Sequence, residues 1–366
     1  MGDKTGIEWT DATWNPIRGC SRVSDGCRNC YAETVANRFK GPGLPYEGLI
    51  AKGGQWNGKI RIVEHLIDQP LRWRRPRRIF VNSMSDLFHE NVPDELIDKV
   101  FAVMALCPQH TFQVLTKRPN RMLEYCKSLG KHRSVDRVSI ASAQLQADGL
   151  FSYTHTSGGW CLPNVWLGVS VEDQATAEER IPLLLATPAA VRWISAEPLL
   201  GPLDLDLSRC ETHDRDFITD DEHCGECLAD GWSGDMPTGH WLDPLNGGLD
   251  WVVVGGESGS GARPMHPEWP RYLRDQCVNA GVPFLFKQWG DWGDEESIER
   301  TGTAWCGWWE LYPEDGGAPR KTWTRVWPEV THEVFKVGKK HAGRYLGDRT
   351  WDEYPPAHNL SRELRK

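Results

Sequence analysis

The sequence lacks several features that would indicate particular classes of protein. It has no run of about 18 apolar residues, so no segment is long enough for a membrane-spanning helix. Its first residues have neither the basic start nor the apolar core of a signal peptide. We therefore expect a cytoplasmic protein with no membrane partner. The formal net charge of −9 also provides no overall attraction for nucleic acid.

Cysteine, by contrast, is plentiful, with eleven in 366 residues. In a reducing compartment, closely spaced cysteines are more often metal ligands or catalytic groups than disulfides. The length suits one large barrel domain with insertions or two ordinary domains. The content of 39% hydrophobic and 25% charged residues is typical of a globular protein.

A repeated pattern along the chain indicates a parallel α/β fold. Six short runs rich in β-branched and aromatic residues end in polar or charged side chains, and helical patterns follow several of them. This alternation predicts a partial or complete TIM-like (β/α) barrel of about six to seven parallel strands, whose carboxyl ends form the mouth of the site. The runs are residues 77–86, 111–117, 165–173, 191–197, 249–258 and 282–289.

Two stretches break this alternation and a third follows it. We expect the barrel to span residues 1–290, with insertions at 130–163 and 203–249. After Gly290 the chain becomes rich in Trp and Gly and then basic. This change predicts a C-terminal extension over residues 291–366 that caps the barrel.

Three cysteines in one short segment have the pattern of a metal-binding loop. Cys20, Cys27 and Cys30 are spaced C-x6-C-x2-C, with Gly, Ser and Asp among the residues between them. A helical pattern starts directly after Cys30, and its dipole would favour thiolates and an anionic cluster. Three thiolates can hold three irons of a 4Fe–4S cluster and leave the fourth iron open. The apolar face of the helix would consist of Ala32, Val35, Ala36 and Phe39.

Two other interpretations of these cysteines are a zinc site completed by a distant histidine and three unrelated cysteines. Structural zinc needs four ligands, and no fourth ligand lies nearby in the sequence. Three cysteines this close together, beside a strand–helix barrel pattern, also make coincidence a poor explanation. An iron–sulfur cluster is therefore the preferred interpretation.

The chain also resembles a known family. The cysteine loop is followed by Tyr31-Ala32, and then by FVNSMSDLFH, LTKRP, SAEPLLGPL, GGESGSGARPM, FKQWG and GRYLGDRTWDEYP. These motifs resemble those of a phage-associated family of unknown function with a three-cysteine motif. That family is itself similar to the radical S-adenosylmethionine (SAM) superfamily. The superfamily's usual spacing is C-x3-C-x2-C, and Asn29 stands here where the superfamily has an aromatic residue.

The resemblance implies a role in binding SAM for two of the strand ends. The second strand end would meet the methionine part of SAM through Ser83, Ser85 and Asp86. A helix N-cap or a loop salt bridge is the alternative for Asp86. Ser170 and Glu172 would hold the ribose hydroxyl groups.

The remaining strand ends carry charged groups and glycines. Gly255 and Gly256 would let the backbone approach a ligand closely. The basic side chains suit a substrate that bears a carboxylate or phosphate, and the alternative is a closed network of salt bridges with the strand-end acids. The candidate catalytic residues are Glu197, Glu257, Lys117 and Lys287.

The second insertion contains another candidate metal site. Cys210, His213, Cys224 and Cys227 are spaced C-x2-H-x10-C-x2-C, which gives two chelating pairs separated by a short loop. Structural Zn²⁺ is the first expectation, followed by an auxiliary iron–sulfur cluster and by free thiols, with His223 as a replacement for His213. We expect ordinary buried side chains at Cys107, Cys126, Cys277 and Cys306.

The stretch RWRRPRR, residues 72–78, carries five arginines around Trp73. It is either a solvated connector whose arginines pair with acidic neighbours or a phosphate-binding patch whose Trp73 stacks on a base. The second possibility, the 19 tryptophans and the phage association favour nucleic acid or a nucleotide as the substrate.

Together these features predict a radical SAM enzyme that generates a 5′-deoxyadenosyl radical and needs an electron donor. A phage-encoded partner enzyme is a further expectation. The alternative is a non-catalytic iron–sulfur or zinc protein that binds nucleic acid or a partner enzyme. A zinc hydrolase ranks last, because it needs His and Asp at strand ends that here carry Glu, Lys and Ser.

Overall fold

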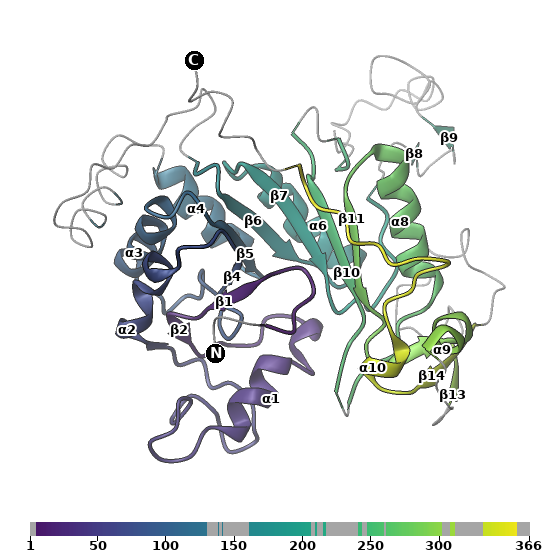
Figure 1. The fold of residues 1–366 in the computed structure, drawn as a ribbon, viewed down its shortest axis with the longest axis horizontal. Coiled ribbons are helices and arrows are strands. Elements are labelled where there is room, and N and C mark those ends of the chain that lie inside the picture. The colour runs from purple at the N-terminus through teal and green to yellow at the C-terminus, as the bar shows by residue number, and fades with distance from the viewer. Residues whose placement is uncertain are drawn as a thin grey trace, which may run out of the picture.

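A curled sheet of seven parallel strands forms the centre of the protein (Figure 1). The strand order is β1-β4-β5-β6-β7-β10-β11, so β1 and β11 are edge strands and the barrel is open. This confirms the predicted partial barrel. The strands are β1 (Ala12–Trp14), β4 (Arg78–Val81), β5 (Thr111–Thr116), β6 (Val165–Ser170), β7 (Val191–Ala196), β10 (Trp251–Gly255) and β11 (Phe284–Gln288).

The computed structural model describes most of the chain. The described residues are 5–129, 138, 141, 161–205, 209–210, 215–216, 241–243, 247–259, 261–301, 308–311 and 332–356. Most of both predicted insertions therefore lies outside the described residues, and the proposed division into domains stays a prediction. Among the described residues, no helix has the length and apolar character needed to span a bilayer.

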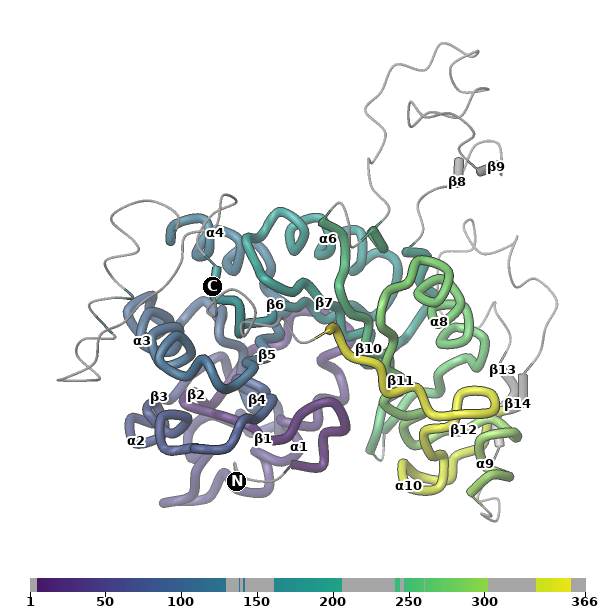
Figure 2. Tube along the Cα trace, turned by 45° about the horizontal axis from the view of Figure 1, so that its top comes forward, coloured from purple at the N-terminus to yellow at the C-terminus, as the bar shows by residue number. Residues whose placement is uncertain are grey.

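Both faces of the sheet are buried, which explains the nearly continuous apolar character of the strands. Val252 and Val254 of β10 face outward into the main hydrophobic core, whereas Trp251 and Val253 face inward. Figure 2 shows the strands curling around this interior. The helices that pack on the outer face are α3 (Asp94–Ala105), α4 (Pro119–Leu129), α6 (Gln174–Leu185) and α8 (Glu268–Ala280).

Tryptophans fill the inside of the curled sheet. The ring centroids of Trp9 and Trp193 are 5.2 Å apart, and those of Trp193 and Trp251 are also 5.2 Å apart. Trp166 extends the cluster, with its ring centroid 5.7 Å from that of Trp251. A Cβ atom on Gly168 would lie 2.5 Å from Cε2 of Trp193, so the glycine leaves room for this indole. We call these four indoles the tryptophan cluster.

The chain after β11 packs beside that edge strand. The Phe286 N–H group donates to the Trp351 carbonyl (3.0 Å), and the Glu353 N–H group donates to the Phe284 carbonyl (3.2 Å). The expected cap therefore runs along β11 in its described part. Its elements are β12 (Trp292–Asp294), α9 (Glu295–Thr301), β13 (Trp308–Leu311), β14 (His332–Lys336) and α10 (Lys339–Ala342), with an antiparallel sheet in the order β12-β14-β13.

Residues 18–62 form a small projection that we call the cysteine lobe. It contains η1 (Asp25–Cys27) and α1 (Tyr31–Arg38) and lies between the paired strands β2 (Ile17–Arg18) and β3 (Arg61–Ile62). Its helix starts directly after Cys30, as predicted. Phe39 was expected on the buried face of this helix, but α1 ends at Arg38 and Phe39 is 44% exposed. The core of the lobe consists of Ala32, Ala36, Tyr46, Leu49 and Trp56 and is completed by Met84 from the segment after β4, with Cys20 and Cys30 packed against it.

The arginine stretch leads into the first residue of β4. It therefore lies at the amino ends of the strands, opposite the carboxyl ends where the cavity is. Trp73 is buried, so its ring is not free to stack on a base. Arg72 pairs with Asp68, and Arg78 pairs with Asp11 (3.2 Å). These contacts favour the connector interpretation. The remaining short elements are α2 (Glu64–Ile67), η2 (Gln69–Arg72), β8 (Arg209–Cys210) and β9 (Arg215–Asp216).

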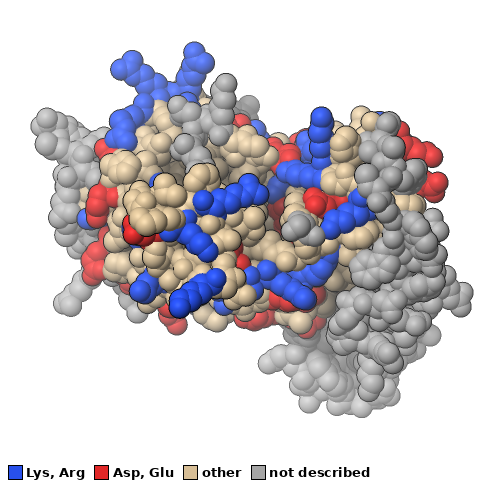
Figure 3. Space-filling model, turned by 90° about the horizontal axis from the view of Figure 1, so that it is seen from below, with Lys and Arg blue, Asp and Glu red and all other residues tan. Residues whose placement is uncertain are grey.

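Lys and Arg side chains are prominent on the side of the molecule where α1 lies (Figure 3). Acidic side chains are also visible among them on that face.

Candidate functional site

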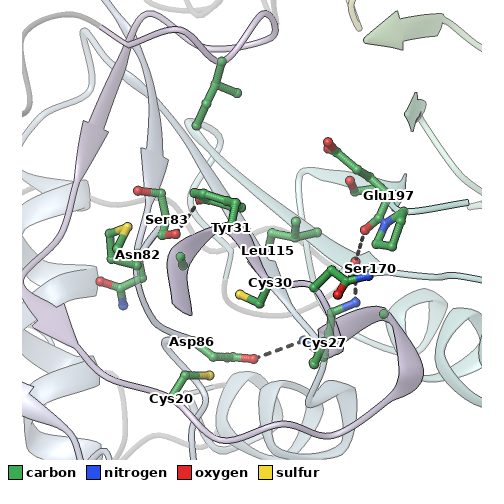
Figure 4. A pocket seen from close by; sticks show the side chains of 18 of the residues that line it. Cys20, Cys27, Cys30, Tyr31, Asn82, Ser83, Asp86, Leu115, Ser170 and Glu197 are labelled. Atoms are coloured by element: carbon green, nitrogen blue, oxygen red, sulfur yellow. Dashed lines mark hydrogen bonds between the residues drawn. The ribbon is translucent and has the colours of Figure 1, made fainter. Parts of the chain in front are cut away.

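A cavity of about 370 Å³ lies at the carboxyl ends of the strands. All three cysteines of the loop line it, and Figure 4 shows them with several strand-end residues. Its apolar part includes Trp9, Phe80 and Leu115. The predicted strand-end residues that line it are Ser83, Ser85, Asp86, Lys117, Ser170, Glu197, Gly256, Glu257 and Lys287.

The pKa values of the Cys20 and Cys30 thiols are raised above their ordinary value. Burial, followed by the neighbouring Asp86 carboxylate, raises the pKa of the Cys20 thiol to about 12. Burial also raises the pKa of the Cys30 thiol, although the backbone N–H groups of Glu33 and Ala32 at the start of α1 act in the opposite direction. Both thiols are therefore protonated at neutral pH unless a bound cation displaces their protons.

Arg118 holds the first cysteine against the sheet. Its Nη1 atom lies 4.0 Å from Cys20 Sγ and donates to Asp86 Oδ2 (3.0 Å). Nη2 donates to Ser21 Oγ (2.6 Å), and Nε donates to Glu90 Oε2 (2.9 Å). Arg118 belongs to the LTKRP motif but was not among the candidate site residues predicted from the sequence. Its position directly after β5, two residues beyond the last strand residue, was the signal for a more specific role.

The Asp86 carboxylate is occupied by donors of the protein itself. Oδ1 accepts from Thr116 Oγ1 (2.8 Å) and from the Phe88 N–H group (2.9 Å). Oδ2 accepts from the Lys117 N–H group (3.1 Å) and from Arg118. Of the two roles expected for Asp86, these contacts favour the loop salt bridge over the binding of an amino group.

The three predicted serine ligands line the cavity but donate their hydroxyl hydrogens to the protein. What these hydroxyl groups can offer a ligand is therefore an acceptor oxygen. The bonds join Ser83 to Asn15 Oδ1 (3.2 Å), Ser85 to the Ile17 carbonyl (2.9 Å) and Ser170 to the Glu197 carbonyl (3.2 Å).

Glu172 lies behind the cysteine loop instead of lining the cavity. Its side chain is 1% exposed, and Oε1 accepts from Ser24 Oγ in the loop (3.0 Å). Lys117 and Arg180 pair with the same carboxylate, the latter at 3.1 Å. Burial raises the pKa of this carboxyl group, but the two cations outweigh it and the net shift is downward. A Cβ on Gly26 would lie 2.4 Å from Glu172 Cγ, so Glu172 packs closely against the loop, and its role in holding a ribose stays a prediction.

Glu257, after β10, holds the other end of the loop. Its Oε2 atom accepts from Asn29 Nδ2 (2.9 Å), and Oε1 accepts from Arg263 Nη2 (2.8 Å). Arg263 also donates to the Asp25 carbonyl in the loop (3.1 Å). Burial raises the pKa of the Glu257 carboxyl group. Hydrogen bonds from Arg263 and Asn29 lower this pKa by more, so the net shift is downward. Asn29, in the place of the superfamily's aromatic residue, thus joins the loop to the sheet.

Glu197 and Lys287 form an ion pair in the wall of the cavity. Lys287 Nζ donates to Glu197 Oε1 (2.6 Å), and Gln288 Nε2 lies 3.4 Å from the same oxygen. Figure 4 shows Glu197 on the other side of the view from Cys20. Gly255 does not line the cavity but lies behind Glu197, where a Cβ would be 3.4 Å from Glu197 Cδ.

The cysteine loop suits a cluster in its chemistry. The thiol of Cys30 is close enough to that of Cys20 to raise its pKa, and Cys27 is close enough to Cys30 to raise the pKa of the Cys30 thiol. Within the described ranges, no three His, Cys, Asp or Glu side chains are placed to hold a single metal ion. Three thiols presented from separate points of one loop fit a cluster in which each iron takes one thiolate.

The predicted zinc site cannot be placed in the same way. His213, Cys224 and Cys227 lie outside the described residues, and for Cys210 only the backbone of β8 is described. Among the cysteines expected to be ordinary buried residues, Cys306 is also outside the described part. The other three are buried as predicted: Cys107, Cys126 and Cys277.

Comparison with known proteins gives a family but no activity. A family model described as "Protein of unknown function (DUF5131)" matches residues 4–355. No curated protein matches the sequence. A solved structure of spore photoproduct lyase complexed with dinucleoside spore photoproduct is 11% identical, covers 78% of this chain and 79% of its own, and has a TM-score of 0.39. A mutant of spore photoproduct lyase is 10% identical, with 76% and 75% covered and a TM-score of 0.35. A likeness this distant carries no argument about mechanism or substrate.

Proposed function

This chain belongs to the DUF5131 family of unknown function, and we propose that it is a radical SAM enzyme with a 4Fe–4S cluster on Cys20, Cys27 and Cys30. The observation that carries the proposal is the support of the cysteine loop by three strand ends. Residues after β5, β6 and β10 each bond to the loop through a charged side chain. When bound and reduced, such a cluster supplies the electron that cleaves SAM to methionine and a 5′-deoxyadenosyl radical.

The residues around the loop fit this role. Arg118 beside Cys20 and the N–H groups at the start of α1 beside Cys30 favour thiolates and an anionic cluster. Trp9 and Phe80 line the cavity with apolar surface and would exclude water from a bound ligand. Glu197 and Lys287 face the same cavity from β7 and β11, and we infer that they contact the substrate.

The identity of the substrate stays a prediction. The arginine stretch was one reason to expect nucleic acid or a nucleotide. However, Trp73 is buried, and the stretch lies at the amino ends of the strands, away from the cavity. A solved structure of spore photoproduct lyase contains a dinucleoside spore photoproduct. This ligand is a property of that protein and not of the present chain. The phage association and a phage-encoded partner enzyme also stay predictions of the resemblance.

The test is anaerobic reconstitution of the full chain with iron and sulfide. We expect about four irons per chain, an EPR spectrum that changes when SAM is added, and formation of 5′-deoxyadenosine. The variant Cys20→Ala/Cys27→Ala/Cys30→Ala should lose all three signals. Cys107→Ala, which removes a buried cysteine outside the loop, is the matched control and should keep them.

Two results would contradict the proposal. Zinc in the loop with no uptake of iron would show that the cysteines form a different site. Iron uptake with neither a SAM-dependent change in the EPR spectrum nor 5′-deoxyadenosine would favour the alternative, a non-catalytic iron–sulfur protein that binds nucleic acid or a partner enzyme.

A further inference from the structure

Exposed large apolar side chains are concentrated in the cysteine lobe. Among the described residues, seven such side chains are exposed, and five of them lie between residues 23 and 62. Single exposed apolar residues are normal on a protein surface, whereas a concentration of them marks an interaction site. The five are Val23, Tyr31, Phe39, Leu44 and Ile62.

The same lobe is basic in an acidic protein. Residues 18–61 contain eight Lys and Arg and three Asp and Glu, a net charge of +5, whereas the whole chain carries −9. Several of these cations are exposed and form no ion pair with the described residues, including Arg28, Arg38, Lys40, Lys52 and Lys59.

The lobe also contains the proposed cluster ligands. Cys20 and Cys30 pack against the lobe's own core, which includes Ala36 and Trp56. The same two cysteines line the cavity. Val23 and Tyr31 of the exposed set also line the cavity, so a protein seated on the lobe would lie at the cavity mouth and be separated from the thiols only by this small core.

We propose that the cysteine lobe is the docking surface for an acidic one-electron donor protein that reduces the cluster. The proposal rests on the proposed function. One electron passes from the reduced flavin or iron–sulfur group of the donor to the cluster, and no bond is formed or broken. The donor is oxidised by one electron and the cluster is reduced by one.

The composition of the surface favours a protein over a nucleic acid. The lobe exposes aliphatic side chains such as Val23, Leu44 and Ile62 together with lysines and arginines, and protein interfaces combine apolar and charged groups in this way. Interfaces with nucleic acid are more polar and depend on phosphate contacts and stacking. A basic surface on one side would also steer an acidic partner toward the cysteines and raise the association rate.

The experiment measures how fast the reconstituted full chain is reduced under anaerobic conditions. Reduced flavodoxin serves as the acidic protein donor, and dithionite serves as a small reductant that needs no docking. The test variant is Lys40→Glu/Lys52→Glu in the lobe. The matched control is Arg74→Glu/Arg75→Glu, which changes the net charge equally but at exposed positions before β4.

We expect the second-order rate constant with flavodoxin to fall about tenfold or more in the lobe variant at low salt and to change less than about twofold in the control. Added salt should reduce the difference. Reduction by dithionite should be the same in all three proteins. Phe39→Ser/Leu44→Ser, which removes apolar surface without a change of charge, should also slow reduction by flavodoxin only.

Other results would overturn the docking proposal in distinguishable ways. Equal slowing in the lobe variant and in the control would show an effect of net charge alone. Unchanged flavodoxin kinetics, together with loss of binding to a single-stranded oligonucleotide, would assign the lobe to nucleic acid. A dimer that is lost in the lobe variant while flavodoxin kinetics stay unchanged would assign it to a second copy of the chain. Failure of dithionite to reduce any of the proteins would instead contradict the proposed function itself.

Discussion

Two lysine–glutamate pairs at the mouth of the sheet look alike in the sequence and differ in the structure. Lys117 and Glu172 join β5 to β6, whereas Lys287 and Glu197 join β11 to β7. The Glu172 side chain is 1% exposed and is also paired with Arg180, while the Glu197 side chain is 21% exposed and lines the cavity. The cysteine loop covers the carboxylate of the first pair, although Lys117 lines the cavity, and leaves the carboxylate of the second pair open, so the loop decides which glutamate is structural.

The largest effect is expected from breaking the covered pair. Glu172→Gln leaves two cations without their carboxylate at a buried position, so it should lower the free energy of unfolding by about 3 kcal/mol. Urea unfolding at pH 7, followed by circular dichroism, measures this change. A loss below about 1 kcal/mol, the range of exposed pairs, would show that the two pairs are energetically equivalent.

A smaller loss should follow from crowding the contact between the loop and the covered pair. The added methyl group of Gly26→Ala would lie 2.4 Å from Glu172 Cγ, so the loop or the glutamate has to move, at a cost of about 2 kcal/mol. Gly53→Ala, in the same lobe but with no atom within 4 Å of the added carbon, is the matched control. Unfolding free energy and iron bound per chain should both fall for Gly26→Ala only. Equal behaviour of the two variants would contradict close packing of the loop on Glu172.

The contribution of Glu172 should depend on pH. Its pKa is lowered in the folded protein from an ordinary value of 4.5, so its stabilising effect is complete above that value and is lost as the pH falls through the folded pKa. The difference in unfolding free energy between the wild type and Glu172→Gln should therefore be constant from pH 7 to about 5 and shrink at lower pH. A difference that grows as the pH falls would mean that the sign of the shift is wrong.

The smallest effect on stability is expected from the open pair. Glu197→Gln should change the free energy of unfolding by less than about 1 kcal/mol, because the carboxylate is partly exposed. The same variant should form 5′-deoxyadenosine at least about tenfold more slowly, because Glu197 faces the cavity. Full turnover in this variant would remove Glu197 from the candidate catalytic residues.

Much of the fold could be predicted from the sequence because its strands are buried on both faces. Continuous apolar runs such as that of β10 are distinctive, and six of the seven strands were located in this way. The seventh, β1, has only three residues and is too short to give a pattern. The charged strand ends were also found, because charge directly after an apolar run is unusual.

The roles of those strand ends could not be predicted in the same way. Arg118 and Glu172 bond to loop residues that are 97 and 148 positions away in the sequence, and no local pattern records such a contact. Asn29 was identified only as a departure from the superfamily, although it donates a hydrogen bond to Glu257. Charge at the strand ends therefore identified the position of the site. Which of these residues support the loop and which face the cavity could be decided only once the path of the loop was known.

The tryptophan cluster has an optical consequence. Trp9 lines the cavity and its ring lies against Trp193 and Trp251, so light absorbed by one of these indoles can pass to the others. A ligand that enters the cavity would lie against Trp9, and a coloured group at the cysteines would accept the excitation and quench the emission. The protein thus carries its own fluorescent reporter, and loading of the site can be followed in unmodified protein by its ultraviolet fluorescence.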